Sequence, residues 1–141
     1  MKFPAIKTLL HLQLLYLVLA IGFNVISLWR VENGLSGLTS TSPMAGIVTM
    51  LVILLVVIIG YLGFLKVYCV FNTLLFSLVA VNGVYGHLLQ YSNVDWHLLY
   101  LNRAVWNAAI MINVFGVIIA LTSSLSIAIA TVTGAAGNQE S

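Results

Sequence analysis

The amino-acid sequence predicts an all-α membrane protein, namely a four-helix transmembrane bundle with a short interfacial helix in its third connection. The 141-residue chain has a mean hydropathy of +1.13 and 6% charged residues, whereas soluble domains have about 25%. Its apolar residues form four blocks, 8–29, 45–65, 67–90 and 104–132. Each block reaches the ~20 residues that a helix needs to cross a bilayer. Such a chain has room for one transmembrane domain, residues 1–141, that ends in a polar tail, 133–141.

The first block follows two lysines, Lys2 and Lys7, as the apolar segment of a cleavable signal peptide also does. Its apolar run, 8–29, has about 22 residues, which exceeds the ~7–15 apolar residues of a signal peptide. No small-residue cleavage site follows the run. We therefore expect a retained first span.

The connections differ in length and composition. The first, RVENGLSGLTSTSPM, is rich in Gly, Ser and Thr and ends near Pro43, which suits the first turn of the next helix. Between the second and third blocks only Gly60, Gly63 and Lys66 interrupt the apolar run. This spacing predicts a tight turn, so that the second and third helices form an antiparallel hairpin.

The third connection, residues 91–103, has the pattern of a short helix. Val94, Leu98 and Leu101 recur at helical spacing, with polar residues between them. This is typical of a helix that lies in the membrane interface. Trp96 is suited to the headgroup level, where aromatic side chains are enriched.

Charge asymmetry predicts an orientation. Four spans place both termini on one side, together with Lys2, Lys7 and Lys66, whereas Arg30 and Arg103 lie on the other side. Because lysine and arginine favour the cytoplasmic side, we expect cytoplasmic termini, in a bacterial inner (plasma) membrane. The lipid bilayer is therefore one expected partner of this chain. The few cations form no basic stripe, which counts against nucleic-acid binding.

Small and polar residues form a stripe along three of the four blocks, as is typical of helix interfaces in membranes. The stripes are Gln13, Tyr16, Ala20, Asn24 and Ser27; Asn72, Val79, Gly83, Gly86, His87 and Gln90; and Asn113, Gly116, Ala120, Ser123, Ala130 and Gly134. On the fourth block Met111, Val114, Ile118, Leu121 and Leu125 occupy the opposite side. The second block is aliphatic on nearly all sides, so we expect it to have the largest share facing lipid or a partner chain.

Five amides lie within the spans: Asn24, Asn72, Asn82, Asn107 and Asn113. They have two interpretations, as interhelical hydrogen bonds that hold the bundle together or as the lining of a polar cavity for an ion or small solute. Asn82 and Asn107 fall off the main stripes and are the better candidates for facing a ligand or a neighbouring subunit. No Asp or Glu lies in any span, which counts against proton- or cation-coupled transport.

Residues 81–103 gather most of the remaining polar chemistry. His11 is expected at the opposite membrane face from His87, so the two cannot share a haem iron, whereas His87 and His97 lie on the same side. A haem or quinone site would draw on His87, His97, Tyr85, Tyr91, Trp96 and Arg103. The alternative interpretation is that these residues form an aromatic and charged belt at the membrane boundary.

Catalytic and metal-binding patterns are absent from the sequence. There is no GxSxG, no HExxH and no pair of carboxylates, and the single Cys69 belongs to no zinc or disulfide pattern. The sequence therefore does not favour an enzyme, and it predicts no metal site. It predicts no cofactor except under the haem or quinone alternative.

Three functions are compatible with these observations. The first is a small integral membrane protein that binds another membrane protein or itself, as an accessory, anchoring or assembly subunit or as an immunity-type protein. The second is a redox membrane anchor that binds haem or quinone through the cluster in 85–103. The third is a small oligomeric channel or carrier whose path is lined by the five asparagines.

Overall fold

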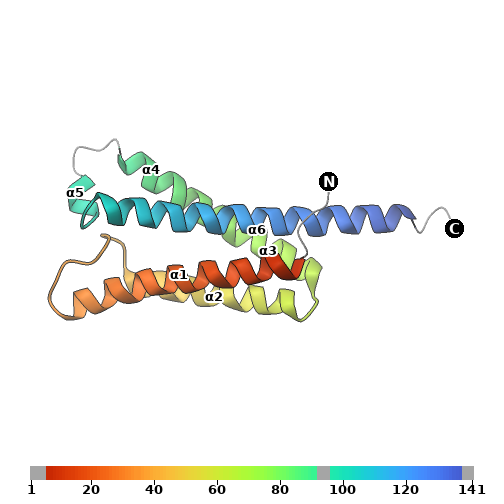
Figure 1. Ribbon diagram of the computed structural model, residues 1–141, viewed down its shortest axis with the longest axis horizontal. Helices are drawn as coiled ribbons and strands as arrows, with labels where there is room; N and C mark the ends of the chain where they lie inside the picture. The colour runs from red at the N-terminus through yellow and green to blue at the C-terminus, as the bar shows by residue number, and fades with distance from the viewer. Residues whose placement is uncertain (1–5, 92–95, 138–141) are drawn as a thin grey trace.

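The computed structural model describes residues 6–91 and 96–137, and within these ranges every long element is a helix. The elements are α1 (Ile6–Glu32), α2 (Pro43–Tyr61), α3 (Leu65–Leu78), the π-helix η1 (Val79–Tyr85), α4 (Gly86–Tyr91), α5 (Trp96–Leu99) and α6 (Arg103–Gly137). Because α3, η1 and α4 run on from one another as one rod (Figure 1), the described chain contains four helices that are long and apolar enough to cross a membrane.

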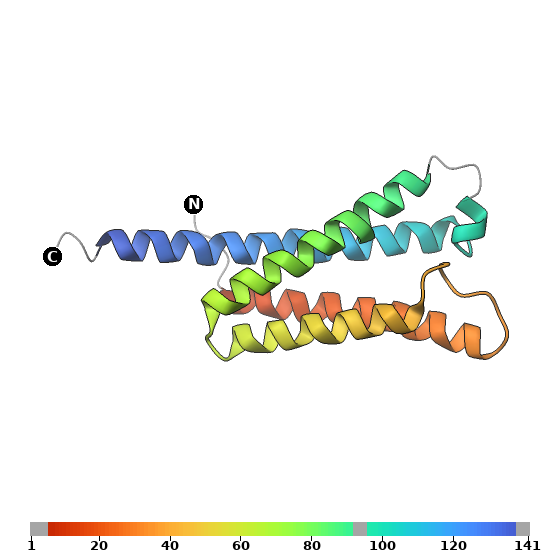
Figure 2. The same ribbon diagram turned by 180° about the vertical axis from the view of Figure 1, so that it is seen from behind.

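The four long helices form a ring. α1 packs between α2 and α6, and α3 likewise contacts both α2 and α6. In Figure 2, α1 and α2 run beside each other, while the rod from α3 to α4 crosses the length of α6 obliquely. The start of α1, the turn between α2 and α3 and the last turns of α6 lie toward one end of the bundle, which we call the turn end (Figure 1). The first loop and α5 lie at the other end, which we call the lid end.

Local sequence sets the helix ends. Ser42 caps α2, since its hydroxyl accepts a 3.4 Å hydrogen bond from the Ala45 N–H, and Pro43 occupies the first helical position. The hairpin turn comes earlier than the sequence pattern indicated, because α2 ends at Tyr61 rather than at residue 65. Gly63 makes this turn with φ of +87°, a conformation that glycine adopts without steric cost.

The expectation that the second helix has the largest outward-facing share is wrong. In the most apolar window of α2, 28% of residues are buried inside the bundle, compared with 22% for Leu65–Leu89 and for Arg103–Val132. Two glycines allow α2 to pack this closely. A Cβ at Gly46 would lie 2.1 Å from the Asn24 side-chain oxygen, and one at Gly60 would lie 2.9 Å from the Tyr68 ring.

The small and polar stripes of the first and fourth blocks do face the bundle. Gln13, Tyr16, Ala20 and Ser27 of α1 are buried, as are Gly116, Ala120 and Ser123 of α6. On the opposite side of α6, Met111, Ile118, Leu121 and Leu125 are exposed. Ala130 is exposed despite its place in the stripe, and it lines a surface pocket at the turn end together with Ile6 and Leu65.

A buried polar network joins α1, α3 and α6 in the half of the bundle near the turn end. The Tyr68 hydroxyl donates to Gln13 Oε1 at 2.7 Å and accepts from Ser123 Oγ at 2.8 Å. Asn72 accepts from Gln13 Nε2 at 2.8 Å and donates to the Ala120 carbonyl and Ser124 Oγ, each at 2.9 Å. These mutual bonds satisfy polar groups that would be costly to bury alone.

The first loop and the third connection pair with each other at the lid end. Thr39 and Tyr100 form an isolated antiparallel β-bridge. Ser40 N–H donates to the Leu99 carbonyl at 2.9 Å, and Leu101 N–H donates to the Leu38 carbonyl at 3.0 Å. We call this paired structure the lid.

The lid includes α5, which is a single helical turn in the connection where the sequence predicted a short helix. Its Leu98 is 70% exposed. Val94, which also supported that prediction, lies outside the described residues.

Candidate functional site

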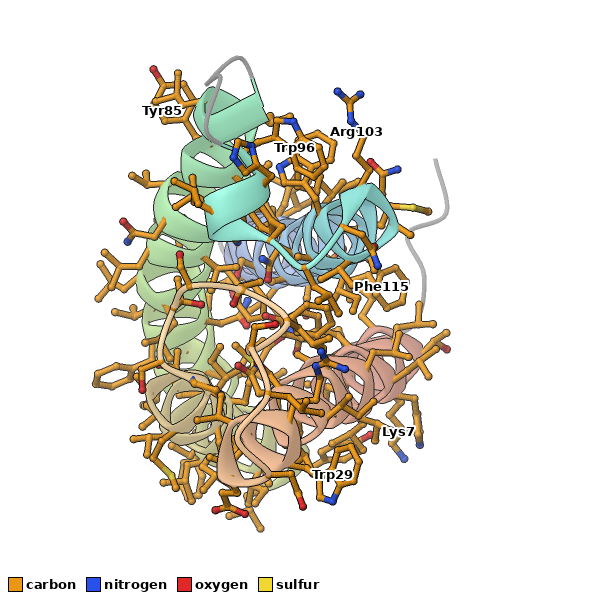
Figure 3. The ribbon with its side chains drawn as sticks, turned by 90° about the vertical axis from the view of Figure 1, so that its left-hand side faces the viewer. Lys7, Trp29, Tyr85, Trp96, Arg103 and Phe115 are labelled. Atoms are coloured by element: carbon orange, nitrogen blue, oxygen red, sulfur yellow. The ribbon has the colours of Figure 1, made fainter. Side chains whose placement is uncertain are left out.

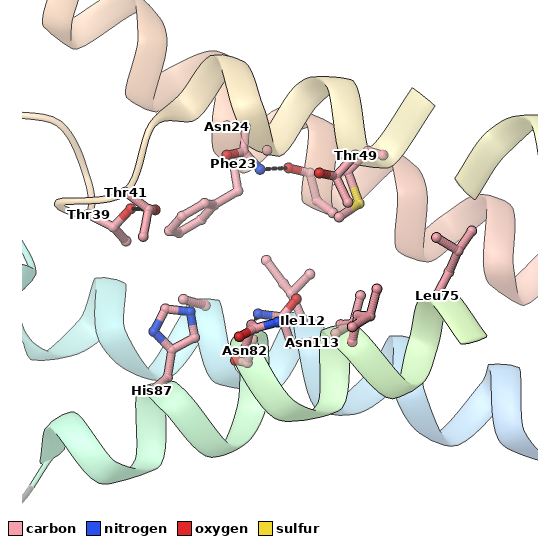
Figure 4. A pocket seen from close by; sticks show the side chains of 17 residues that line it. Phe23, Asn24, Thr39, Thr41, Thr49, Leu75, Asn82, His87, Ile112 and Asn113 are labelled. Carbon is pink, nitrogen blue, oxygen red and sulfur yellow. Dashed lines mark hydrogen bonds between the residues drawn. The ribbon is translucent and has the colours of Figure 1, made fainter. Parts of the chain in front are cut away.

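A cavity of about 420 Å³ lies inside the bundle, between the lid and the middle of the helices. Every long helix contributes to its wall. The lining residues are Ala20, Phe23, Asn24, Thr39, Thr41, Gly46, Thr49, Met50, Leu75, Leu78, Val79, Asn82, Gly83, His87, Ala109, Ile112 and Asn113. Figure 4 shows Asn24 and Thr49 on one wall and Asn82, His87 and Asn113 on the facing wall.

The π-helix forms part of the cavity wall. η1 packs against α6 and continues α3 and α4, and it brings Val79, Asn82 and Gly83 to the cavity. Asn113 of α6 donates a 3.0 Å hydrogen bond to the Gly83 carbonyl, and a Cβ at Gly83 would lie 2.8 Å from the donating Asn113 nitrogen. A side chain at residue 83 would therefore displace the Asn113 amide from its bond to this carbonyl. Single π-helical turns within α-helices are frequent at functional sites.

The asparagines of the cavity have hydrogen-bonding groups to spare. Asn24 donates to the Ala20 carbonyl of its own helix at 2.8 Å. Within residues 6–91 and 96–137 no hydrogen bond uses the carboxamide oxygens of Asn24 and Asn113 or any polar atom of the Asn82 side chain. A bound molecule with a donor or an acceptor could therefore bond to these amides.

The lid end of the cavity is formed by His87 and its neighbours. The Tyr100 hydroxyl hydrogen-bonds to His87 Nδ1, and the Trp106 indole donates to the His87 backbone carbonyl at 3.1 Å. Tyr100 is 3% exposed, and burial raises the pKa of its phenol to about 12. The phenol keeps its proton at ordinary pH, and the direction of its bond to Nδ1 follows from which nitrogen of His87 carries the imidazole proton. This bond ties the cavity wall to the lid.

The cavity has a buried floor and an exposed rim. Ala20, Met50 and Ala109 are buried. Four lining residues are exposed. Thr41 lies just before α2 and Thr49 within it, while Leu78 is at the end of α3 and Asn82 is in η1. The mouth of the cavity therefore lies between α2 and the rod formed by α3 and η1.

An aromatic layer lies at the side of the cavity that faces the turn end, where Tyr16 is one helical turn from the lining residue Ala20 and Phe76 follows the lining residue Leu75. Tyr16 and Phe76 are both 0% exposed, and their ring centroids are 5.4 Å apart. The Tyr16 hydroxyl is buried without a hydrogen-bond partner in the described part of the chain. This layer separates the cavity from the polar network of Gln13, Tyr68 and Asn72.

The structure divides the proposed cofactor cluster, because the Trp96 ring contacts His97 and Arg103 at the lid end whereas His87 lines the cavity. His87 lines the cavity, whereas His97 is exposed and lines a separate surface pocket on the lid. Tyr85 and Arg103 point away from the bundle in Figure 3. The Arg103 guanidinium lies 5.1 Å from the centre of the Trp96 ring, in a cation–π contact. The side chain of Tyr91, the remaining member, is outside the described residues.

The five asparagines divide into three groups. Asn24, Asn82 and Asn113 line the cavity. Asn72 belongs to the separate buried network, which matches its interpretation as an interhelical bond. Asn107 is exposed and does not line the cavity.

Sequence reasoning missed several residues of the site. Thr39, Thr41 and Thr49 bring hydroxyls to the cavity wall, and Tyr100 and Trp106 hold His87. The threonines could have been noticed from the hydroxyl-rich run TSTSP before the second helix. Tyr100 and Trp106 gave no such signal, because their contacts with His87 join different elements.

The lining residues define the chemistry that the cavity can offer. No Asp, Glu, Lys or Arg is among them, and His87 is the one titratable side chain that they include. Across residues 6–91 and 96–137, no group of three His, Cys, Asp or Glu side chains is placed to hold a metal ion. No protein family, no curated protein and no solved structure matches this chain.

Proposed function

We propose that this chain is an integral membrane protein whose bundle holds a small uncharged molecule in the cavity between α2 and η1. Membrane insertion is supported by the four long apolar helices and by large hydrophobic side chains that are exposed on each of them. Soluble monomers rarely expose apolar surface on such a scale. When the four long helices cross the bilayer, α5 and the lid lie at the membrane interface.

The observation that carries the proposal is a cavity of ligand size with unused amide groups. Its volume of about 420 Å³ falls within the ~300–1,000 Å³ that is typical of small-molecule sites. Amides within an apolar bundle are costly unless they are hydrogen-bonded. A ligand that bonds to Asn24, Asn82 or Asn113 would therefore be stabilised by those bonds as well as by apolar contact.

The cavity favours a quinone over a haem as the ligand of the redox alternative. A haem held by two histidines would need His87 and His97 at one place, but only His87 lines the cavity. An uncharged quinone remains within the proposed class, because its carbonyl oxygens can accept hydrogen bonds from amide groups such as that of Asn82.

The test compares two tryptophan substitutions on similar threonines. Thr49 and Thr73 are both exposed, and each donates to the carbonyl four residues earlier, at 2.9 and 2.8 Å. Thr49 lines the cavity and Thr73 does not. Native mass spectrometry of protein extracted in mild detergent should show a bound small molecule in the wild type and in Thr73→Trp, and a clear loss of it in Thr49→Trp. Wild-type protein without any bound molecule would contradict the proposal.

A second candidate function is binding to another membrane protein or to a second copy of this chain. It is favoured by the end of α6, which extends beyond the bundle and leaves Val132 70% exposed (Figure 1). Val132→Asp should then release a chain that co-purifies in mild detergent, whereas Leu98→Asp, at an equally exposed leucine on the lid, should not. Release by both variants, or no co-purifying chain at all, would count against this candidate.

The proposed orientation has cytoplasmic termini in a bacterial inner membrane. Lys7 and Lys66, near the starts of α1 and α3, lie at the turn end of the bundle. Arg30, in the last turn of α1, and Arg103, at the start of α6, lie at the lid end. The two described lysines agree with Lys2 in favouring the cytoplasm for the turn end. The lid and the cavity then belong to the outer half of the membrane.

A further inference from the structure

The position of the mouth identifies the kind of molecule that the cavity takes. We infer that the ligand is an uncharged lipid with a hydroxyl or carbonyl head, which enters sideways from the bilayer between α2 and η1. This inference rests on the proposed function, because it names the ligand class of the same cavity.

The first support is the depth of the mouth. Thr49 is six residues beyond the start of α2 at Pro43, which corresponds to ~9 Å along a helix. The rim continues from Thr41, just before α2, to Thr49, and on the other side it includes Leu78 and Asn82. The mouth thus extends from the end of the helices into the part that faces hydrocarbon. A lipid could place its head beside the amides while its chain stays in the bilayer.

The second support is that both ends of the cavity are covered along the bundle axis. At one end the bridge between Thr39 and Tyr100 joins the two connections, and Leu38 and Tyr100 are 8% and 3% exposed. At the other end lies the layer of Tyr16 and Phe76, both fully buried. The side mouth is therefore the broad route into the cavity.

The third support is the charge of the wall. A carboxylate or phosphate head would need a cation, but the lining contains no Lys or Arg, and an ammonium head would find no Asp or Glu. Moving an uncompensated charge into such a site is much more costly than moving a hydroxyl or carbonyl group. Each side-chain amide of Asn24, Asn82 and Asn113 has an N–H donor and a carbonyl acceptor, which suits these residues to an uncharged head group.

The experiment uses two photoactivatable probes that differ only in the head group. The full chain is reconstituted in phosphatidylcholine vesicles, and each sample receives a hexadecanol or a hexadecanoic acid that carries a diazirine in its chain, at alkaline pH where the acid is ionised. After irradiation, intact mass gives the labelled fraction, and peptide mapping locates the label. We expect the alcohol to label cavity residues at least ~10-fold more than the acid, in line with the cost of burying a charge.

Matched variants connect the label with the cavity. Asn82→Leu removes an exposed amide that lines the cavity, and Asn107→Leu removes an exposed amide that does not. Loss of one hydrogen bond corresponds to about a fivefold weaker labelling in Asn82→Leu, with Asn107→Leu unchanged. Thr49→Trp should reduce labelling further by obstructing the mouth, and Thr73→Trp serves as its control.

The possible outcomes separate this inference from the proposed function. Equal labelling of the cavity by acid and alcohol would overturn the assignment of an uncharged head. If native mass spectrometry finds a bound molecule but the alcohol labels only outward-facing residues, the lipid assignment is wrong and the cavity still binds a small molecule. If neither measurement finds a molecule in the cavity, both the lipid assignment and the proposed small-molecule binding are wrong. A quinone carrying the same diazirine chain distinguishes a carbonyl head from a hydroxyl head within the inferred class.

Discussion

A Cβ atom at Gly116 would lie 2.5 Å from Cε2 of the Tyr16 ring, so α6 can pass α1 at this level only because residue 116 is glycine. Tyr16 also packs against Phe76 of α3. One glycine on α6 thus permits the aromatic layer of Tyr16 and Phe76, which covers the cavity on the side that faces the turn end.

Replacing Gly116 with Ala should destabilise the bundle. The added methyl group would have to displace the Tyr16 ring, and overpacking of this kind costs ~1–3 kcal/mol. The matched control is Gly22→Ala, because a Cβ at Gly22 meets no atom within 4 Å. That substitution should leave stability unchanged or raise it by ~0.5–1 kcal/mol through helix propensity. Thermal unfolding in detergent measures both, and an equal loss would contradict the close approach of Gly116 and Tyr16.

Tyr16 and Tyr68 should respond in opposite ways to loss of their hydroxyls. The Tyr16 hydroxyl is buried without a partner in the described chain, so Tyr16→Phe should keep or raise the free energy of unfolding by up to ~1 kcal/mol. The Tyr68 hydroxyl bonds to Gln13 and Ser123, and Tyr68→Phe should cost ~1–3 kcal/mol because it leaves these groups unpaired. Urea or SDS titrations of the two variants give the comparison. A loss on Tyr16→Phe as large as on Tyr68→Phe would indicate an unseen partner of the Tyr16 hydroxyl.

Alkaline pH should loosen the lid. Burial raises the pKa of Tyr100 to about 12 from the ~10 of an unfolded chain. Between these two values the folded state holds a proton that the unfolded state has released, so stability falls as pH rises. The contribution is complete below about pH 10 and is lost through about pH 12.

The measurement is the melting temperature as a function of pH for wild type, Tyr100→Phe and Tyr85→Phe. Tyr100→Phe should flatten the alkaline decline, although it lowers the neutral-pH value by removing the hydroxyl bonded to His87. Tyr85 is 59% exposed, and Tyr85→Phe should keep the wild-type profile. If Tyr100→Phe declines as steeply as the wild type, the buried phenol is not the cause.

Membrane insertion predicts a labelling pattern. Single cysteines at Ser36 and Leu98 are both at the lid end, and one at Leu62 is in the turn between α2 and α3. In a Cys69→Ala background, an impermeant maleimide added to intact cells should label the first two and not the third. Labelling of all three from one side would rule out four membrane-crossing helices.

The helices and their inner faces could be predicted because both follow from local chemistry. Gln13, Ala20 and Ser27 recur at helical spacing, and each is buried where the pattern put it. The prediction for α2 failed because periodicity records side chains and takes no account of how closely two backbones approach. In the sequence Gly60 interrupts the apolar run and Gly46 lies within the aliphatic run without a signal of its own, whereas in the structure they are the points of contact with Asn24 and Tyr68.

The site was only partly predictable for a different reason. Asn24 and Asn113 stood out as amides on inward stripes, and both line the cavity. His97 stood out by residue type, but it is exposed in a surface pocket on the lid, whereas His87 lines the cavity. Such placements depend on the pairing of Thr39 with Tyr100, which joins segments that are far apart in the chain and have no periodicity to indicate their partner.

The π-helix has a consequence for how this chain tolerates insertions and deletions. In η1 the hydrogen bonds join residues five apart instead of four, so this segment accommodates one residue more than an α-helix would over the same rotation. Deleting one residue within 79–85 would therefore let the rod run as an uninterrupted α-helix while the residues after the deletion keep their side of the rod. The same deletion in the α-helical stretch Leu65–Leu78 would instead rotate His87 by about 100°, away from the cavity and from Tyr100. The π-helix is therefore the stretch of the rod in which a one-residue deletion should disturb the position of His87 least.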